Sequence, residues 1–103
     1  MKYKIISQAE AKNIMKSRIR YKILDVRTKE EFQIGHIPNA INISHDEIAN
    51  NLNLVPYKDE IILVYCRSGH RSKIASEILS DYGYTNIYEF GGIIDWDGDI
   101  ISS

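Results

Sequence analysis

The feature that most constrains this chain is a short apolar run that leads directly into a loop rich in glycine and arginine. Residues 61–64, Ile-Ile-Leu-Val, are apolar and mostly β-branched, which favours a buried strand. Beyond the loop, apolar residues recur at the spacing of one helix face, at Ile74, Ala75, Ile78, Leu79 and Tyr82. The sequence therefore predicts a strand that passes through a loop of residues 66–72 into a helix.

The loop holds the only cysteine of the protein, Cys66. The first amides of a helix lack intrahelical partners and carry partial positive charge, so a loop that closes on a helix start favours an anion. Arg67 and Arg71 add two cations, and Gly69 permits a turn that points amide groups inward. A lone cysteine is more often a buried, inert core residue. Because of these neighbours, we expect instead a reactive thiol that ionises more readily than a free one.

Composition and charge exclude several classes of function. A chain of 103 residues with 44% hydrophobic and 26% charged residues predicts one globular domain over residues 1–103. The net charge of −1 provides no basic field for nucleic acid or a membrane surface. A single cysteine excludes an internal disulfide and a cysteine-rich metal site, and suits a reducing compartment. No apolar segment is long enough for a signal peptide or a bilayer span, so we expect a cytoplasmic protein.

Strands and helices are predicted to alternate along the chain. Three capping-box pairs mark helix starts, at Ser7 and Glu10, Thr28 and Glu31, and Ser44 and Glu47. The expected strands cover residues 3–6, 21–26, 40–43, 61–65 and 84–90, and the expected helices cover 9–16, 29–34, 45–51 and 72–82. We expect a turn at 91–92 and a last helical turn at 93–96 that lays Trp96 on the core. This alternation implies a parallel sheet with helices on both faces, and ligands bind at the carboxyl ends of such strands, where Cys66 lies.

Four segments, in this order and spacing, resemble a single-domain rhodanese, a family of sulfurtransferases. They are Leu24-Asp25-Val26-Arg27 with Glu31-Phe32, the run from Gly35 to Asn42, the loop 66–72, and Gly91-Gly92-Ile93 with Trp96. The resemblance implies a rhodanese-like α/β fold with a central, mostly parallel sheet of about five strands and helices on both faces. It also implies thiosulfate sulfurtransferase activity through a persulfide on Cys66, without a metal or other cofactor.

In the implied reaction, the Cys66 thiolate attacks the outer sulfur of a small-molecule donor such as thiosulfate or a persulfide, and cyanide or a thiol then removes that sulfur. The expected substrate-binding residues are those of the loop: Arg67, Ser68, Gly69, His70, Arg71 and Ser72. Arg67 and Arg71 would attract the anionic donor. His70 would tune the charge of the loop or contact the acceptor, or else is an exposed loop residue. Ser72 would begin the helix with its hydroxyl near the sulfur.

Asp25 and Arg27 end a strand at the same edge of the sheet as Cys66. We expect them either to orient the loop from behind or to be purely structural. Arg27 and Glu31 are four residues apart, so an ion pair between them is the simplest expectation.

Two other functions stay open. One is a sulfur-relay or sensing module in which a partner protein, such as a sulfur carrier or a desulfurase, loads Cys66. The other is a cysteine phosphatase, whose loop resembles this one. Phosphatases, however, hold one more residue between cysteine and arginine than the four that separate Cys66 from Arg71. The shorter loop suits a single added sulfur atom, so the sequence favours sulfur transfer.

Overall fold

The computed structural model describes residues 2–102. Five parallel strands form one sheet in the order β1-β5-β4-β2-β3. Their bounds are β1 (Lys4–Ile5), β2 (Tyr21–Asp25), β3 (Ala40–Asn42), β4 (Ile61–Cys66) and β5 (Ile87–Gly92). The predicted parallel sheet of about five strands is therefore confirmed, with the cysteine-bearing strand at its centre.

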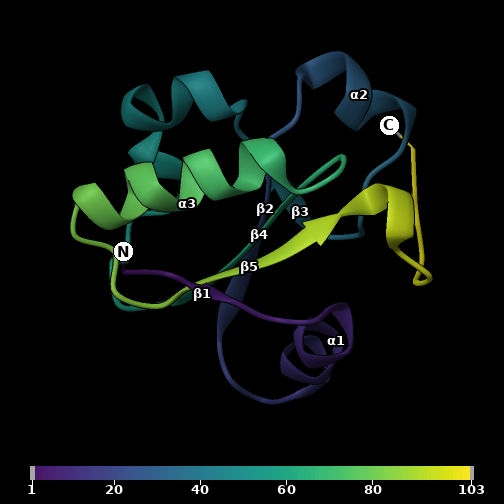
Figure 1. The fold of residues 1–103 in the computed structure, drawn as a ribbon, viewed down its shortest axis with the longest axis horizontal. Helices are drawn as coiled ribbons and strands as arrows, with labels where there is room; N and C mark the ends of the chain where they lie inside the picture. Colours follow the sequence, from purple (N-terminus) through teal and green to yellow (C-terminus); the bar gives the residue numbers. More distant parts are fainter. Residues whose placement is uncertain (1, 103) are drawn as a thin grey trace.

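Helices cover both faces of this sheet (Figure 1). They are α1 (Gln8–Lys16), α2 (Lys29–Ile34) and α3 (His70–Asp81), with the 3-10 helices η1 (His45–Asn50), η2 (Leu52–Leu54) and η3 (Ile93–Asp95). The capping boxes of α1 and α2 form as predicted. The third is wrong, because the Ser44 hydroxyl donates to Asp46 and makes no capping bond to the helix. None of the helices among residues 2–102 is long and apolar enough to cross a membrane.

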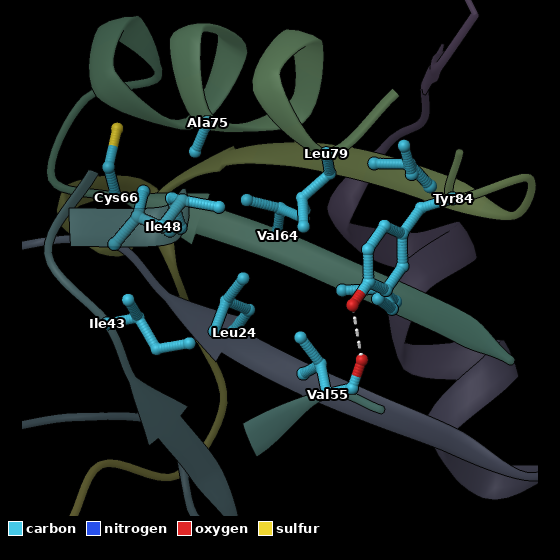
Figure 2. Close-up of a cluster of buried hydrophobic side chains, with 12 residues drawn as sticks. Leu24, Ile43, Ile48, Val55, Val64, Cys66, Ala75, Leu79 and Tyr84 are labelled. Carbon is cyan, nitrogen blue, oxygen red and sulfur yellow. Dashed lines mark hydrogen bonds between the residues drawn. The ribbon is translucent and has the colours of Figure 1, made fainter. Parts of the chain in front are cut away.

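Strand β4 is buried on both faces, and its side chains alternate between two apolar clusters. Val64 and Cys66 join the cluster that contains Ala75 of α3, as Figure 2 shows. Tyr65 joins the cluster that contains Ala11 of α1. This two-residue period assigns the sulfur to the α3 face of the sheet, close to the start of that helix.

The predicted turn at residues 91–92 is wrong, because β5 continues to Gly92. Gly92 pairs with Cys66 after a register shift in β4. A Cβ atom on Gly92 would lie 2.0 Å from the carbonyl oxygen of Arg67. Glycine is therefore required at this position for β5 to run directly against the loop that follows β4.

The residues after β5 form η3 and then pass beside the end of α2. Trp96 packs on the cluster facing α1, as predicted. Beyond it, Ile101 and His36 exchange two backbone hydrogen bonds of 2.8 and 2.9 Å, in an antiparallel bridge. Sequence patterns did not place this part of the chain, and the bridge fixes Ile101 beside the end of α2.

Candidate active site

Cys66 ends β4 and is only 1% exposed. Three residues later, Gly69 has a φ of +103°, a left-handed conformation that glycine adopts without strain. This turn aims the Gly69 N–H at the sulfur, and it donates a hydrogen bond of 3.0 Å to Cys66 Sγ. It is the one amide among residues 2–102 that makes this contact. The turn at Gly69 is thus present, but only one of the several amide groups expected to point inward donates to the sulfur.

The helix α3 begins at His70 rather than at Ser72 as predicted, so Ser72 lies in its first turn, where it is fully buried. Its Oγ is 3.3 Å from Cys66 Sγ, so the prediction that this hydroxyl lies near the sulfur is confirmed. On its other side, the hydroxyl donates to the Glu89 carboxylate at 2.5 Å. Sequence reasoning missed Glu89. The available signal was the two-residue period of a strand. Because Glu89 follows the core residue Ile87 by two positions, its carboxylate points to the same α3 face of the sheet.

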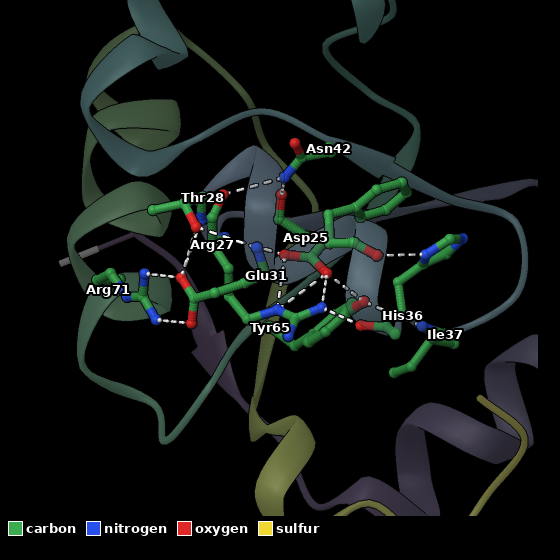
Figure 3. A network of polar contacts seen from close by, with 11 residues as sticks. Asp25, Arg27, Thr28, Glu31, His36, Ile37, Asn42, Tyr65 and Arg71 are labelled. Carbon is green, nitrogen blue, oxygen red and sulfur yellow. Dashed lines mark hydrogen bonds and ion pairs between the residues drawn. The ribbon is translucent and has the colours of Figure 1, made fainter. Parts of the chain in front are cut away.

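Arg71 is bound to the helix α2 rather than free beside the sulfur (Figure 3). Its guanidinium donates to both carboxylate oxygens of Glu31, at 2.6 and 2.9 Å. Chiefly through these bonds, the pKa of Glu31 is lowered to about 2. The pKa of Arg71 is raised, first by Glu31 and to a lesser degree by nearby Cys66. Arg71 therefore lies near the thiol while it joins α2 to the loop.

The predicted ion pair between Arg27 and Glu31 is wrong. Arg27 instead donates to Asp25, at 2.6 Å from its Nη2 atom. Asp25 is fully buried, and a buried carboxylate requires a charged or hydrogen-bonding partner. Tyr65 also donates a hydrogen bond to Asp25, of 2.6 Å. Burial, and secondarily Asp25, raises the pKa of the Tyr65 hydroxyl.

This buried network lies on the sheet face opposite Cys66, since Tyr65 points toward α1. Neither Asp25 nor Arg27 makes a side-chain hydrogen bond to residues 66–72. Their contact with the loop runs through Tyr65, which directly precedes the cysteine. An orienting role for the two side chains stays a prediction.

The remaining side chains of the loop lie at the surface of the protein. Arg67, Ser68 and His70 are exposed. The carbonyl of Arg67 accepts a hydrogen bond of 3.1 Å from Ile94, which ties the loop to η3. Within residues 2–102, the Arg67 side chain has no ion pair. A role for Arg67 in binding an anionic donor stays a prediction, as does a role for His70.

Together the fold and the loop define a class: α/β proteins with one buried cysteine between a central parallel strand and the helix that follows. The model of the Rhodanese-like domain family matches residues 7–99. The chain belongs to this family.

Relatives in bacteria support this membership over most of their length. Thiosulfate sulfurtransferase PspE of Escherichia coli is 41% identical over 73 residues, which are 70% of this chain and 70% of that protein. Putative sulfurtransferase YtwF of Bacillus subtilis is 31% identical over 99 residues, covering 96% of this chain and 95% of the relative. The Rhodanese-like domain protein of Staphylococcus aureus has a crystal structure with a TM-score of 0.86 at 37% identity, covering 97% and 98% of the two chains.

Longer proteins contain a similar segment. The adenylyltransferase and sulfurtransferase UBA4 of Candida albicans is 31% identical over 105 residues, which cover 94% of this chain. The chain spans only 24% of the length of that relative.

Proposed function

We propose that this protein is a sulfurtransferase that carries a sulfane sulfur on Cys66 as a persulfide. The observation that carries the proposal is the hydrogen bond of 3.0 Å from the Gly69 amide to Cys66 Sγ, at the start of a helix. An amide donor and a helix start both favour a negative charge on sulfur, whether it belongs to a thiolate or to a persulfide. Membership in the rhodanese-like family supports the same chemistry.

The proposed donor is thiosulfate, and the proposed acceptor is cyanide or a small thiol. Cys66 Sγ attacks the outer sulfur of thiosulfate, the sulfur–sulfur bond of the donor breaks, and sulfite leaves with the electron pair. The acceptor then attacks the outer sulfur of the persulfide and regenerates the Cys66 thiolate. The name of the Escherichia coli relative supports thiosulfate as the donor to test first.

In this proposal, the two arginines of the loop have different roles. The exposed Arg67 attracts the dianionic donor to the mouth of the loop. Arg71 is engaged by Glu31, and it holds the loop in place while adding positive charge near the sulfur. Direct contact between Arg71 and a donor would require the bond to Glu31 to open.

The test is the production of thiocyanate from thiosulfate and cyanide. We expect turnover by the wild type and by Glu77→Gln, which changes an exposed side chain of α3 outside the loop, and no turnover by Cys66→Ser. Turnover by Cys66→Ser that equals the wild type would reject the proposal. Hydrolysis of an aryl phosphate that depends on Cys66 would reject it in favour of the phosphatase alternative.

A second candidate function is a sulfur relay in which a protein partner loads Cys66. It is favoured by the 1% exposure of Cys66, since a docked partner could open the loop where a free anion would enter slowly. The name of the Candida albicans relative, which joins adenylyltransferase to sulfurtransferase, is consistent with it. Persulfide loading by a cysteine desulfurase that is much faster than loading by thiosulfate would favour the relay. The reverse order of rates would exclude it.

A further inference from the structure

The mechanism above leaves one buried ionisable group beside the sulfur without a task. Glu89 of β5 is fully buried. Its Oε2 accepts hydrogen bonds from the Ser72 hydroxyl at 2.5 Å and the Gly91 amide at 2.9 Å. Its Oε1 has no hydrogen bond among the described residues. A carboxylate removed from water in this way is costly unless its charge is compensated or neutralised by a proton.

The charges that face Glu89 come from three sides. From α3, the Lys73 ammonium lies 3.5 Å from Glu89 Oε1, but it is part of a half-exposed side chain and also donates to the Gly69 carbonyl at 3.2 Å. From β4, Cys66 faces it across Ser72. Arg71, which directly precedes Ser72 in α3, forms an ion pair with Glu31 instead. Glu89 is therefore only partly compensated by Lys73, and Cys66 is the ionisable group that hydrogen bonds join to it through Ser72.

A continuous chain of hydrogen bonds joins the thiol to the carboxylate. Cys66 Sγ is 3.3 Å from Ser72 Oγ, which is 2.5 Å from Glu89 Oε2. A serine hydroxyl has one proton to donate. While Ser72 donates it to Glu89, its oxygen accepts from the Cys66 thiol. If Ser72 is to stabilise a thiolate, its proton must turn to the sulfur, and Glu89 must then hold a proton of its own.

We propose that Glu89 is a positioning residue that takes up the proton of the Cys66 thiol through Ser72. In this step the S–H proton passes to Ser72 Oγ while the Ser72 proton passes to Glu89 Oε2. One thiol and one carboxylate become one thiolate and one carboxylic acid, without release of a proton to solvent. The proposal rests on the proposed sulfurtransferase function and specifies how its nucleophile is formed.

The proton balance holds through the whole cycle. The thiolate attacks the donor, sulfite leaves, and the persulfide keeps the single negative charge while Glu89 stays protonated. When the acceptor removes the outer sulfur, the thiolate returns beside the same carboxylic acid. Two adjacent anions bridged by one hydroxyl are thus avoided at each step.

The test is the rate of Cys66 alkylation by iodoacetamide against pH, without any sulfur donor. In the wild type, we expect a level stretch over the pH range in which Cys66 and Glu89 together keep one proton, because forming the thiolate there releases none. In Glu89→Gln, which keeps the shape and the hydrogen-bond acceptor, the rate should rise about tenfold per pH unit across that range, as for one ionising group. Glu77→Gln, on the exposed side of α3, is the control and should keep the level stretch.

Ser72→Ala provides a second route, since it leaves Glu89 in place and removes only the link. It should narrow the level stretch, because Cys66 and Glu89 then interact without the bridging hydroxyl, whereas Glu89→Gln should abolish it. An infrared difference spectrum of persulfidated minus reduced protein, recorded where the reduced pair is mainly thiol and carboxylate, should show a carboxylic-acid band that Glu89→Gln lacks. A wild-type profile with one simple ionisation, unchanged in both variants, would overturn the inference.

This result is separate from that of the proposed function. A simple ionisation together with persulfide formation from thiosulfate would refute the role of Glu89 alone. Failure of any donor to load Cys66 would refute the sulfurtransferase function whatever the alkylation profile shows.

Discussion

Replacing Gly92 by alanine tests how closely the fold and the site depend on each other. The added Cβ would lie 2.0 Å from the Arg67 oxygen, 2.4 Å from its carbonyl carbon and 2.5 Å from Ser68 Cα. Carbon atoms in contact lie about 3.5–4.0 Å apart, so the loop backbone must retreat by about 1 Å or more. Overpacking typically costs about 1–3 kcal/mol. Because the obstructing atoms are main chain, we expect a loss of about 3 kcal/mol.

A loss of this size is readily measured. For a domain of this length, 1 kcal/mol lowers Tm by about 4–8 °C, so a loss of about 3 kcal/mol in Gly92→Ala should lower it by about 12–24 °C. The same retreat pulls the Gly69 amide away from Cys66 Sγ. A displacement of about 1 Å at a reacting centre can cost about 100-fold in rate, and we expect a loss of this order per folded molecule.

The assay pairs urea unfolding with thiocyanate production at a temperature where each variant is folded. Gly83→Ala is the matched control. Gly83 also has a left-handed φ, of +93°, but its nearest neighbours are 3.7 Å away on the Lys58 side chain. It should lose about 1 kcal/mol through backbone strain and keep the wild-type rate. Wild-type stability and rate in Gly92→Ala would refute the reasoning, as would an equal loss of rate in Gly83→Ala.

Three further perturbations have expected outcomes. Glu31→Gln should lower stability at pH 7 by about 1–2 kcal/mol, since it breaks a two-bond, partly exposed ion pair. The pKa of Glu31 is lowered to about 2. The stabilisation by ionised Glu31 is therefore complete above the ordinary pKa of 4.5 and is lost as the pH falls toward 2. In urea unfolding, the free energies of unfolding of the variant and the wild type should converge near pH 2. An equal difference between them at pH 7 and near pH 2 would contradict this. Tyr65→Phe should cost about 2–3 kcal/mol in the same assay, because it leaves Asp25 short of a buried donor, and a loss below about 0.5 kcal/mol would be inconsistent with the network. Arg67→Ala should raise the KM for thiosulfate several-fold at low salt and weaken its salt dependence, and a KM that does not move would remove Arg67 from donor capture.

The fold was accessible to sequence reasoning because its signals are local. Apolar runs, helix periodicity and two of the capping boxes specify the alternation of strands and helices, and that alternation implies a parallel sheet. The position of Cys66 at the carboxyl end of the central strand follows from the same patterns. The turn at Gly69 could be predicted because only glycine adopts its conformation freely.

The errors arose where distant segments meet. The four-residue spacing of Arg27 and Glu31 favours a local pair, but the demand of the buried Asp25 for a cation outweighs it. Glu31 is then free to bind Arg71, forty residues later in the chain. Likewise, two adjacent glycines are typical of a turn, whereas Gly92 is needed for contact with a loop that sequence patterns do not bring beside it.

Glu89 went unnoticed for the same reason. Within its own strand it is an ordinary polar residue before two glycines. Its importance depends on burial and on a hydroxyl from α3, and both appear only once the helix is packed on the sheet.

The intact mass of the protein after incubation with thiosulfate tests the central claim most directly. The wild type should gain the mass of one sulfur atom, lose it again when cyanide is added, and show no gain in Cys66→Ser. An unchanged mass with thiosulfate and with persulfide donors alike, or an equal gain in Cys66→Ser, would contradict a persulfide on Cys66.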